Sequence, residues 1–598
     1  LANVIGDQSL ELLSLVNGSI NLWTLEGDNI SQPVELIAGN GAVAFFVEDF
    51  NGDGHHDIAC ILPEDSAPVR IWFGGYEAGE ASLGAQHRFE MPALREFDAV
   101  RFPGRKAASI AVIERASKRI VLYDVDKEPT KSSGDREADL RVFSFSDSGN
   151  RKRAHVVVDV DGDGLLDLVA TDTEANTIVV YRQIEGKGLQ TGVPYPSLSE
   201  LDYLVASNID GDGDAELFVL SEKEGVVGRC DVGPQGVPFP SPLNISEGMT
   251  PVAMNIVHLE SGPHVAVVVK KGRDYQIDLL AMDGERSSIK LGKLSRAPET
   301  IIALDADQDG RTDLLLFTRD KPMTMLYATD EGFELTESKD MGQYGLVKSA
   351  TSDNTAVFDI DGDGRMELLI AEKNFVRAVR YETDPPPGVS PGWQVVNQIN
   401  VRDSASKLVS LTMLDQQIVA ADEANDRLVF MHRTNGEWIE KESIFIRGFS
   451  FSAIHAGTFS GDGQDNILAI GDDGFAIIRL SGERIALSEF ATWRTSDENR
   501  YQHELVSGDI NSDGFVDLIS LDAGEQMLEI FTFTEARRML YAMGFQVFES
   551  KIFSGGEPRE FQPSQSVIVD VTGDGANDLI LLSHDRVLIY PQAVKPGS

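Results

Sequence analysis

The sequence is poor in cysteine, in positive charge and in long apolar runs. Two cysteines, Cys60 and Cys230, in 598 residues exclude a disulfide framework. No apolar run approaches the ~18 residues of a membrane-spanning helix, so we expect no transmembrane segment. Lys and Arg total 52 against 96 Asp and Glu, a formal net charge of −44. A surface of that sign repels phosphate backbones, so nucleic-acid binding is not expected.

An internal repeat is the main feature that the sequence does contain. An apolar stretch is followed by D-x-D-G-D-G-x-x-D and by a second apolar stretch. Seven strong copies begin at Asp49, Asp159, Asn208, Asp305, Asp359, Asp509 and Asp570. Weaker copies begin near residues 3, 101, 256, 412 and 458. The twelve copies recur about every 51.5 residues, the distance from 3 to 570 divided into eleven steps.

Each repeat has the pattern of four short strands separated by turns. In the copy at Asp159 the first three strands are expected at 155–158, 168–170 and 178–181. Four strands in ~40–50 residues are typical of one β-propeller blade, whereas an array of β-sandwiches would repeat about every 100 residues. We therefore predict an all-β fold of about twelve four-stranded units.

Twelve units are too many for one propeller of ~4–8 blades, so two propellers are predicted. The even division gives an N-terminal propeller over 1–295 and a C-terminal propeller over 296–598. A division into five and seven blades, with the join in the Pro-rich stretch 233–242, stays open. Because the chain ends soon after the third strand of the last unit, that unit is expected to take its outer strand from elsewhere.

The loop of the repeat has the spacing of a site for a hard cation. Positions 1, 3, 5 and 9 offer side-chain oxygens, position 7 offers its backbone carbonyl, and the glycine at position 6 permits a sharp turn. Six to eight such oxygens suit Ca²⁺, whereas zinc would require Cys or His ligands. An EF-hand is excluded because position 12 is never Glu and the flanks are predicted strands. A metal-free acidic turn is the alternative for any single copy.

About seven structural Ca²⁺ sites are therefore predicted. Their candidate ligands, at positions 1, 3, 5, 7 and 9 of the seven loops, are Asp49, Asn51, Asp53, His55 and Asp57; Asp159, Asp161, Asp163, Leu165 and Asp167; Asn208, Asp210, Asp212, Asp214 and Glu216; Asp305, Asp307, Asp309, Arg311 and Asp313; Asp359, Asp361, Asp363, Arg365 and Glu367; Asp509, Asn511, Asp513, Phe515 and Asp517; and Asp570, Thr572, Asp574, Ala576 and Asp578.

Two weaker copies carry residues that oppose a cation. The copy at Arg101 has Arg105 at position 5 and Lys106 at position 6, so we expect it to hold no metal. The copy at Thr458 has Asp462 as its one charged candidate, so weak or absent binding is expected. A loop that can lose its ligands while its strands persist indicates a structural role for the ion.

These motifs resemble the FG-GAP/VCBS repeat family of calcium-binding β-propellers, which includes the integrin α-subunit propeller and secreted bacterial repeat proteins. The resemblance covers nearly the whole chain. It implies calcium in the loop between the first two strands of a blade and a location that is extracellular, periplasmic or at the cell surface. The strand after the loop ends in sequences such as LVATD rather than in the family's Gly-Ala-Pro, which is closer to the bacterial branch.

We therefore expect a non-catalytic scaffold that binds a protein or glycan partner on a propeller face. A polysaccharide lyase or hydrolase, and a structural subunit of a larger extracellular assembly, remain as alternatives. No Gly-rich phosphate loop or H-E-x-x-H helix is present, and the ten histidines are scattered. Three inserts are candidate contact regions: the polar 127–153, 384–393 with an exposed Trp393, and 534–543, read as a short helix. Cys60 and Cys230 are expected to be free thiols.

Overall fold

The computed structural model of the chain is all-β. Its strands are β1 to β49, and two short 3-10 helices, η2 (Tyr344–Leu346) and η3 (Glu423–Asn425), accompany them in the described part. The structure describes residues 2–4, 10–26, 29–31, 33–77, 80–129, 138–145, 153–209, 215–233, 236–281, 284–318, 321, 323–330, 332–336, 342–383, 387–388, 391–548 and 561–592. Within them, no helix has the length and hydropathy of a membrane span.

Two compact units make up the molecule. Unit 1 contains Leu1–Pro129, Arg141–Ser144 and Glu483–Ser598, and unit 2 contains Thr130–Leu140 and Phe145–Gly482. The units therefore do not divide at residue 295. That position lies inside unit 2, where a buried cluster with Ile277 on one side and Leu314 on the other joins the flanking sheets. Unit 2 is an insertion into unit 1 rather than its C-terminal neighbour in the sequence.

Seven sheets form unit 2; six are antiparallel with their strands in chain order, and in the seventh three consecutive strands are followed by one from earlier in the chain. They are β13 (His155–Val158), β14 (Asp167–Asp172), β15 (Thr177–Tyr181) and β18 (Val193–Pro196); β19 (Tyr203–Ser207), β20 (Glu216–Ser221), β21 (Val226–Cys230) and β22 (Ser241–Pro242); β23 (Thr250–Leu259), β24 (Gly262–Lys271), β25 (Asp274–Ala281) and β26 (Arg286–Lys293); β27 (Thr300–Leu304), β28 (Asp313–Phe317), β29 (Thr324–Thr329) and β30 (Gly332–Thr336); β31 (Thr355–Phe358), β32 (Glu367–Glu372), β33 (Phe375–Glu382) and β34 (Gly392–Asn400); β35 (Leu408–Leu414), β36 (Gln417–Asp422), β37 (Arg427–Thr434) and β38 (Glu437–Phe445); and β39 (Ala453–Gly457), β40 (Asn466–Ile470) and β41 (Gly474–Arg479), followed by β12 (Asp139–Ser144). A small hairpin, β16 (Gln183–Ile184) and β17 (Gly188–Leu189), accompanies the first sheet.

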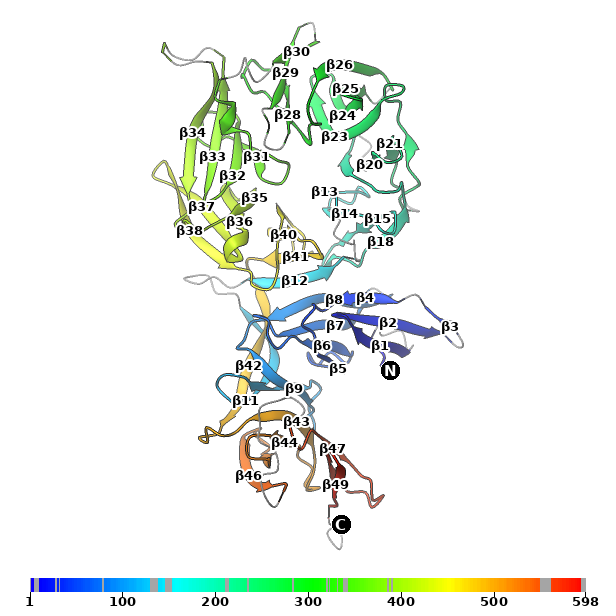
Figure 1. Ribbon diagram of the computed structural model, residues 1–598, viewed down its shortest axis with the longest axis vertical. Coiled ribbons are helices and arrows are strands. Elements are labelled where there is room, and N and C mark those ends of the chain that lie inside the picture. The colour runs from blue at the N-terminus through cyan, green and yellow to red at the C-terminus, as the bar shows by residue number, and fades with distance from the viewer. Residues whose placement is uncertain are drawn as a thin grey trace. The chain divides into compact units, whose positions relative to one another are not determined.

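The sheets of unit 2 follow one another around a ring (Figure 1). Consecutive sheets contact through their first strands or share a buried cluster. The first and last sheets also meet: the Nε2 atoms of His155 and His455 lie 3.0 Å apart, and the amide of Leu189 donates to the carbonyl of Phe459. The ring of unit 2 is thus continuous.

Five sheets form unit 1. They are β1 (Leu10–Val16), β2 (Ser19–Glu26), β3 (Asn29–Ile30) and β4 (Val34–Ile37); β5 (Ala44–Glu48), β6 (Asp57–Ile61), β7 (Val69–Glu77) and β8 (Glu80–Phe89); β9 (Leu94–Val100), β10 (Ser109–Glu114) and β11 (Arg119–Pro129) with β42 (Glu483–Arg494); β43 (Gln502–Gly508), β44 (Asp517–Asp522), β45 (Met527–Phe533) and β46 (Met539–Gln546); and β47 (Gln565–Val569), β48 (Asp578–Ser583) and β49 (Arg586–Tyr590). Each of the twelve predicted repeats thus corresponds to one sheet.

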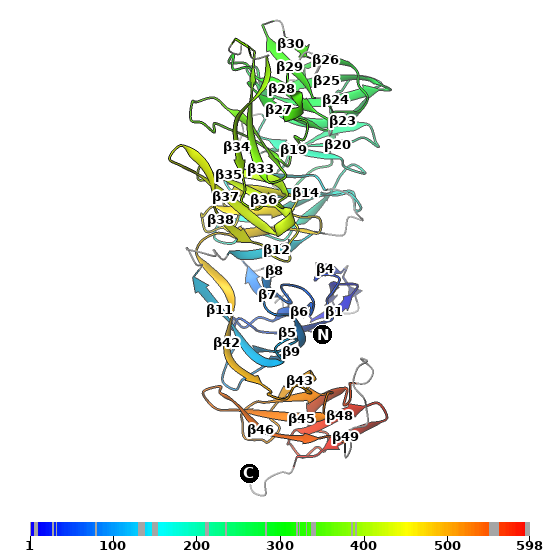
Figure 2. The same ribbon diagram turned by 60° about the vertical axis from the view of Figure 1, so that its left-hand side comes forward.

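Two sheets take a strand from a distant part of the sequence. In unit 1, β42 pairs with β11 over eleven residues of β11, from Arg119 to Pro129, and the two strands run side by side in both views (Figures 1 and 2). β12 follows β41 in the strand order, and the boundary of the two units falls within β12, after Leu140. The exchange was expected at the last repeat, but β47, β48 and β49 form a three-stranded sheet in the described residues. It occurs instead where the chain enters and leaves unit 2.

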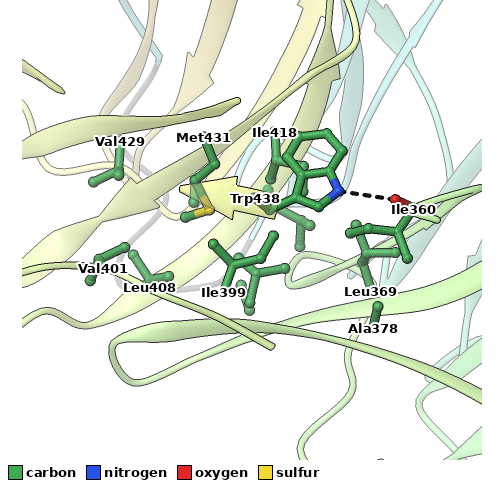
Figure 3. Close-up of a cluster of buried hydrophobic side chains, with 14 residues drawn as sticks. Ile360, Leu369, Ala378, Ile399, Val401, Leu408, Ile418, Val429, Met431 and Trp438 are labelled. Carbon is green, nitrogen blue, oxygen red and sulfur yellow. Dashed lines mark hydrogen bonds between the residues drawn. The ribbon is translucent and has the colours of Figure 1, made fainter. Parts of the chain in front are cut away.

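The second strand of a typical sheet is buried on both faces because a neighbouring sheet packs on each side. β6, β14, β20 and β28 are buried at every residue and read as continuous apolar runs between their polar ends. One junction, between the sheets of β31–β34 and β35–β38, is shown in Figure 3: Trp438 lies among aliphatic side chains, and its Nε1 donates to the carbonyl of Ile360 at 2.9 Å.

Two of the three predicted contact inserts are wrong in their details. Trp393 was expected to be exposed, but it is fully buried in a cluster beside Tyr381. Residues 534–543 were read as a helix, but Met539 begins strand β46, which pairs with β45. Residues 127–129 belong to β11. Of the insert's basic cluster, Arg151 and Lys152 lie outside the described residues, as do 384–386, whereas Arg153 is buried and donates to the carbonyl of Thr171 at 2.9 Å. Both cysteines are buried free thiols, as predicted, and burial raises the pKa of each to about 12.

Candidate metal centres in the repeat loops

Each acidic loop lies between the first and second strands of its sheet. The residue at position 9 is in every strong copy the first residue of the second strand, where the chain turns into the buried part of the sheet. These residues are Asp57, Asp167, Glu216, Asp313, Glu367, Asp517 and Asp578. All are buried, so each carboxylate lies at the inner end of its loop.

The position 9 carboxylate fastens the start of the loop. Asp167 accepts the amide of Val160 at 3.0 Å through Oδ2 and that of Gln183 at 2.7 Å through Oδ1. The contact with the amide at position 2 recurs in all seven loops, at 2.7 to 3.2 Å. This residue type is therefore required by the turn itself, whether or not a cation is bound.

The position 1 carboxylate closes the turn around the glycines. Asp159 accepts the amides of Gly162 and Gly164, both at 2.8 Å, and the same pair of contacts occurs at Asp49, Asp359 and Asp570. Gly164 has a φ of 86°, a left-handed conformation that side chains with a Cβ rarely adopt. The D-x-D-G-D-G pattern thus encodes a tight turn that presents several carboxylates together.

Positions 1, 3 and 9 converge in three of the loops. Single oxygens of the three residues lie within 4.8 Å of one another in each of these sets: Asp159, Asp161 and Asp167; Asp305, Asp307 and Asp313; Asp359, Asp361 and Glu367. In the copy at Asn208, positions 3, 5 and 7 (Asp210, Asp212 and Asp214) lie outside the described residues, whereas Asn208 is exposed and Glu216 is paired with Arg229 at 3.0 Å.

Position 5 does not belong to the three converging sets. Its carboxylate accepts the amide of position 7, as Asp163 does from Leu165 at 2.8 Å, and the pattern recurs from Asp53 to His55, Asp309 to Arg311, Asp363 to Arg365, Asp513 to Phe515 and Asp574 to Ala576. The side chains of Arg311 and Arg365 also pair with Asp309 and Asp363. These arginines partly neutralise the loops in which they occur.

The clustered carboxylates raise one another's proton affinity. Burial raises the pKa of Asp57 to about 7 and the pKa values of Asp167 and Asp313 to about 6, and nearby loop carboxylates add to each rise. Burial and neighbouring carboxylates likewise raise the pKa of Asp161 and of Asp307. A divalent cation would relieve this repulsion.

The donor set fits calcium. Asp161 Oδ1 and Asn511 Oδ1, both at position 3, are buried and have no hydrogen-bond partner. Every candidate side-chain donor is a carboxylate, amide or hydroxyl oxygen, which suits a hard cation that takes six to eight oxygens. Asp159, Asp161 and Asp167 would hold the ion in the loop that follows β13.

In the two weak loops that lack most of the motif's carboxylates, arginine side chains form ion pairs with Asp or Glu of the same chain. In the copy at Thr458, Arg479 Nη2 lies 2.6 Å from Asp462 Oδ2, and Ser460 also donates to Asp462. In the copy at Arg101, Arg105 lies 3.4 Å from Asp124, and Arg101 pairs with Glu48. In both loops, therefore, protein side chains supply the positive charge.

A separate cavity lies along the inner strands of unit 2. It has a volume of about 280 Å³ and is lined mainly by residues of β31, β35 and β39 together with His155 of β13. Burial lowers the pKa of His455, which faces His155, while Asp353 opposes that shift. Sequence reasoning missed this pair because the two histidines are 300 residues apart.

Unit 1 contains a second group of carboxylates on its inner strands. Burial raises the pKa of Glu96 to about 7 and that of Asp98 to about 6 on β9, and raises the pKa of Glu504 on β43 to about 7. Each rise is increased by a neighbouring carboxylate. No sequence motif marks this group, because alternating residues of one strand meet a residue about 400 positions away.

Comparison with known proteins identifies the repeats. Residues 159–220 and 305–370 match a family model described as FG-GAP-like repeat. No curated protein sequence matches the chain. Among solved structures, one chain of "Crystal structure of BBS1N in complex with ARL6DN, soaked with mercury" is similar at 12% identity and a TM-score of 0.38, over 58% of this chain and 98% of that chain. Each of the two matched stretches contains acidic loops of the repeat, so these parts of the chain are FG-GAP-like repeats.

Proposed function

We propose that the protein is a non-catalytic scaffold of calcium-stabilised propeller blades that binds a protein or glycan partner outside the cytoplasm or at the cell surface. The observation that carries this proposal is the convergence of positions 1, 3 and 9 in three loops of unit 2. Unit 2 is a seven-bladed propeller in this proposal, with β12 completing its last blade, and the five sheets of unit 1 are blades of the same type.

The chemistry of the loops supports the proposed location of the protein outside the cytoplasm. Their position 5 carboxylates are exposed and most of those at positions 1 and 3 are half-buried, and arginine already pairs with a carboxylate in four of the loops. Such sites suit the range of ~10⁻⁴–10⁻³ M that is typical of extracellular calcium modules. Millimolar extracellular calcium would fill them, and each filled site would stabilise the fold by about 1.4 kcal/mol at a tenfold excess over its Kd.

Calorimetry and calcium titration test the proposal. The unfolding temperature of the full chain is measured with 2 mM CaCl₂ and with EDTA, and bound calcium is counted by equilibrium dialysis at 2 mM CaCl₂. We expect EDTA to lower the unfolding temperature by several degrees and Asp161→Asn to remove about one bound ion.

Asp462→Asn is the control. Asp462 lies at position 5 of the loop that begins at Thr458, which is expected to bind calcium weakly or not at all, and it is paired with Arg479. It should leave the calcium count unchanged. A chain that binds no calcium and unfolds at the same temperature in EDTA would refute calcium stabilisation. A glycan array and a binding screen with secreted proteins, each with and without calcium, then test the scaffold role.

A further inference from the structure

Within the described part of the chain, side chains cover the first sheet of unit 1 on one face only. Leu13, Leu15 and Leu22 belong to the face that packs on the sheet of β5–β8. Side chains alternate between the two faces of a strand, so Leu10, Leu12 and Val16 point the other way. Their exposed fractions are 50%, 41% and 52%.

Pairing extends this outer face across the sheet. Leu10 is opposite Leu25, Leu12 is opposite Trp23, and Leu25 is opposite Ile30, so all of these side chains share one face. Ile30 is 62% exposed. We call Leu10, Leu12, Val16, Trp23, Leu25 and Ile30 the first-sheet face. Glu35 of β4, which lies opposite Asn21, is an exposed charged residue on the same side of the sheet.

The last sheet of unit 1 has the same property. Leu579 and Leu581 pack toward β43–β46. On the opposite side, Val567 pairs with Ile580, which pairs with Ile589, and Val587 pairs with Leu582. We call Val567, Val569, Ile580, Leu582, Val587 and Ile589 the last-sheet face. Val567, Val569, Val587 and Ile589 are 42–57% exposed.

Apolar faces of this kind are covered at every other junction of unit 1. β44, for example, is buried at all six residues because a sheet packs on each of its sides, whereas β48 keeps Ile580 and Leu582 half-buried. Contiguous exposed apolar patches of this extent mark interaction sites in soluble proteins. The two faces therefore have the chemistry of sheet-to-sheet interfaces that lack their second sheet.

We propose that unit 1 self-associates head to tail, with the last-sheet face of one copy packed on the first-sheet face of another. A second copy is the occupant because each copy carries both faces, and their contact would continue the packing of one sheet on the next that already builds unit 1. Both faces are apolar, so little charge is desolvated on contact. They are also the places where chains of net charge −44 can approach with least repulsion.

Light scattering coupled to size exclusion, and sedimentation velocity, test the proposal on the full chain from 1 to 100 μM. The mass should rise with concentration above the 65.3 kDa of one chain, and more steeply at 0.5 M than at 0.15 M NaCl, because salt screens the repulsion. Leu12→Lys and Val567→Lys should each weaken association at least tenfold. Ile439→Lys, an exposed apolar position on β38 of unit 2, is the control and should associate as the unsubstituted chain does.

Mixing identifies the orientation. The Leu12→Lys chain keeps its last-sheet face and the Val567→Lys chain keeps its first-sheet face, so an equimolar mixture should form a dimer of about 131 kDa that grows no further. Thermal unfolding checks that both variants are folded. A constant mass of 65.3 kDa for the unsubstituted chain would overturn the proposal. So would undiminished association of either variant alone, or a mixture that stays monomeric.

Discussion

Removing one negative charge from the inner strands of unit 1 should stabilise it. Glu504 is partly buried, and Glu96 and Asp98 on the neighbouring strand raise its pKa further, after burial, from 4.5 to about 7. Above pH 7 Glu504 is ionised in both states, and its charge costs more free energy in the folded protein than in the unfolded chain. Glu504→Gln keeps the shape of the side chain and removes the charge.

The size of the effect follows from that pKa. Each unit of pKa corresponds to ~1.36 kcal/mol, which gives about 3 kcal/mol for a fully shielded group. Because the side chain is partly exposed, solvent screening reduces the expected gain to about 1–2 kcal/mol. In a unit of about 250 residues, that gain raises the unfolding temperature by about 2–6 °C.

The gain should depend on pH in a defined direction. Between pH 4.5 and 7 the folded chain holds the Glu504 proton more tightly than the unfolded chain, so stability falls as pH rises through this window and is level above it. Glu504→Gln should therefore match the unsubstituted chain at pH 4 and exceed it at pH 8.

Differential scanning calorimetry at both pH values measures the effect, and hydrogen exchange of β43 assigns the transition to unit 1. Glu535→Gln removes an exposed charge from the same unit and should change little. A gain at pH 4 as large as at pH 8, or no gain at pH 8, would refute the electrostatic reasoning.

Two further predictions concern unit 2. Arg479→Met removes the ion pairs to Asp139, at 3.4 Å, and to Asp462, at 2.6 Å. Because Asp139 is nearly fully buried, the free energy of unfolding measured in urea should fall by about 3 kcal/mol. An unchanged urea midpoint would contradict this role. His455 is held neutral by burial, so the stability of unit 2 should fall as pH drops below 6.5, and His455→Gln should flatten the pH dependence of the unfolding temperature between pH 7 and 5. An equal slope in the two proteins would show that His455 does not titrate in this range.

The repeat was predictable because its signals are local. Apolar runs around a fixed loop located all twelve sheets, and the spacing of Asp159, Asp161 and Asp167 located oxygens that do converge. The hydrogen bond from the amide of Leu165 to Asp163 could not be predicted, because the spacing of the carboxylates does not show which of them also accept backbone amides.

Long-range pairing explains what could not be predicted. Nothing in the sequence of β11 specifies β42 rather than the next strand along the chain, so the insertion of unit 2 left no local signal. Residues 534–543 contain good helix formers, but Met539 lies opposite Phe533 in the sheet, and pairing with β45 overrides that propensity. Trp393 follows a Pro-rich stretch typical of a surface loop, yet the aromatic ring packs inward on Tyr381.

The pairing of β11 with β42 has a consequence for synthesis on the ribosome. About 350 residues separate the two strands, so at ~5–20 residues per second the edge of β11 waits for roughly 20–70 s before its partner emerges. Unit 2 can complete its ring in that interval, since most of its strands are made between the two halves of unit 1. The order of translation therefore imposes an order of folding in which the inner unit matures first, and a nascent chain stalled before β42 would leave β11 open to pairing with another polypeptide.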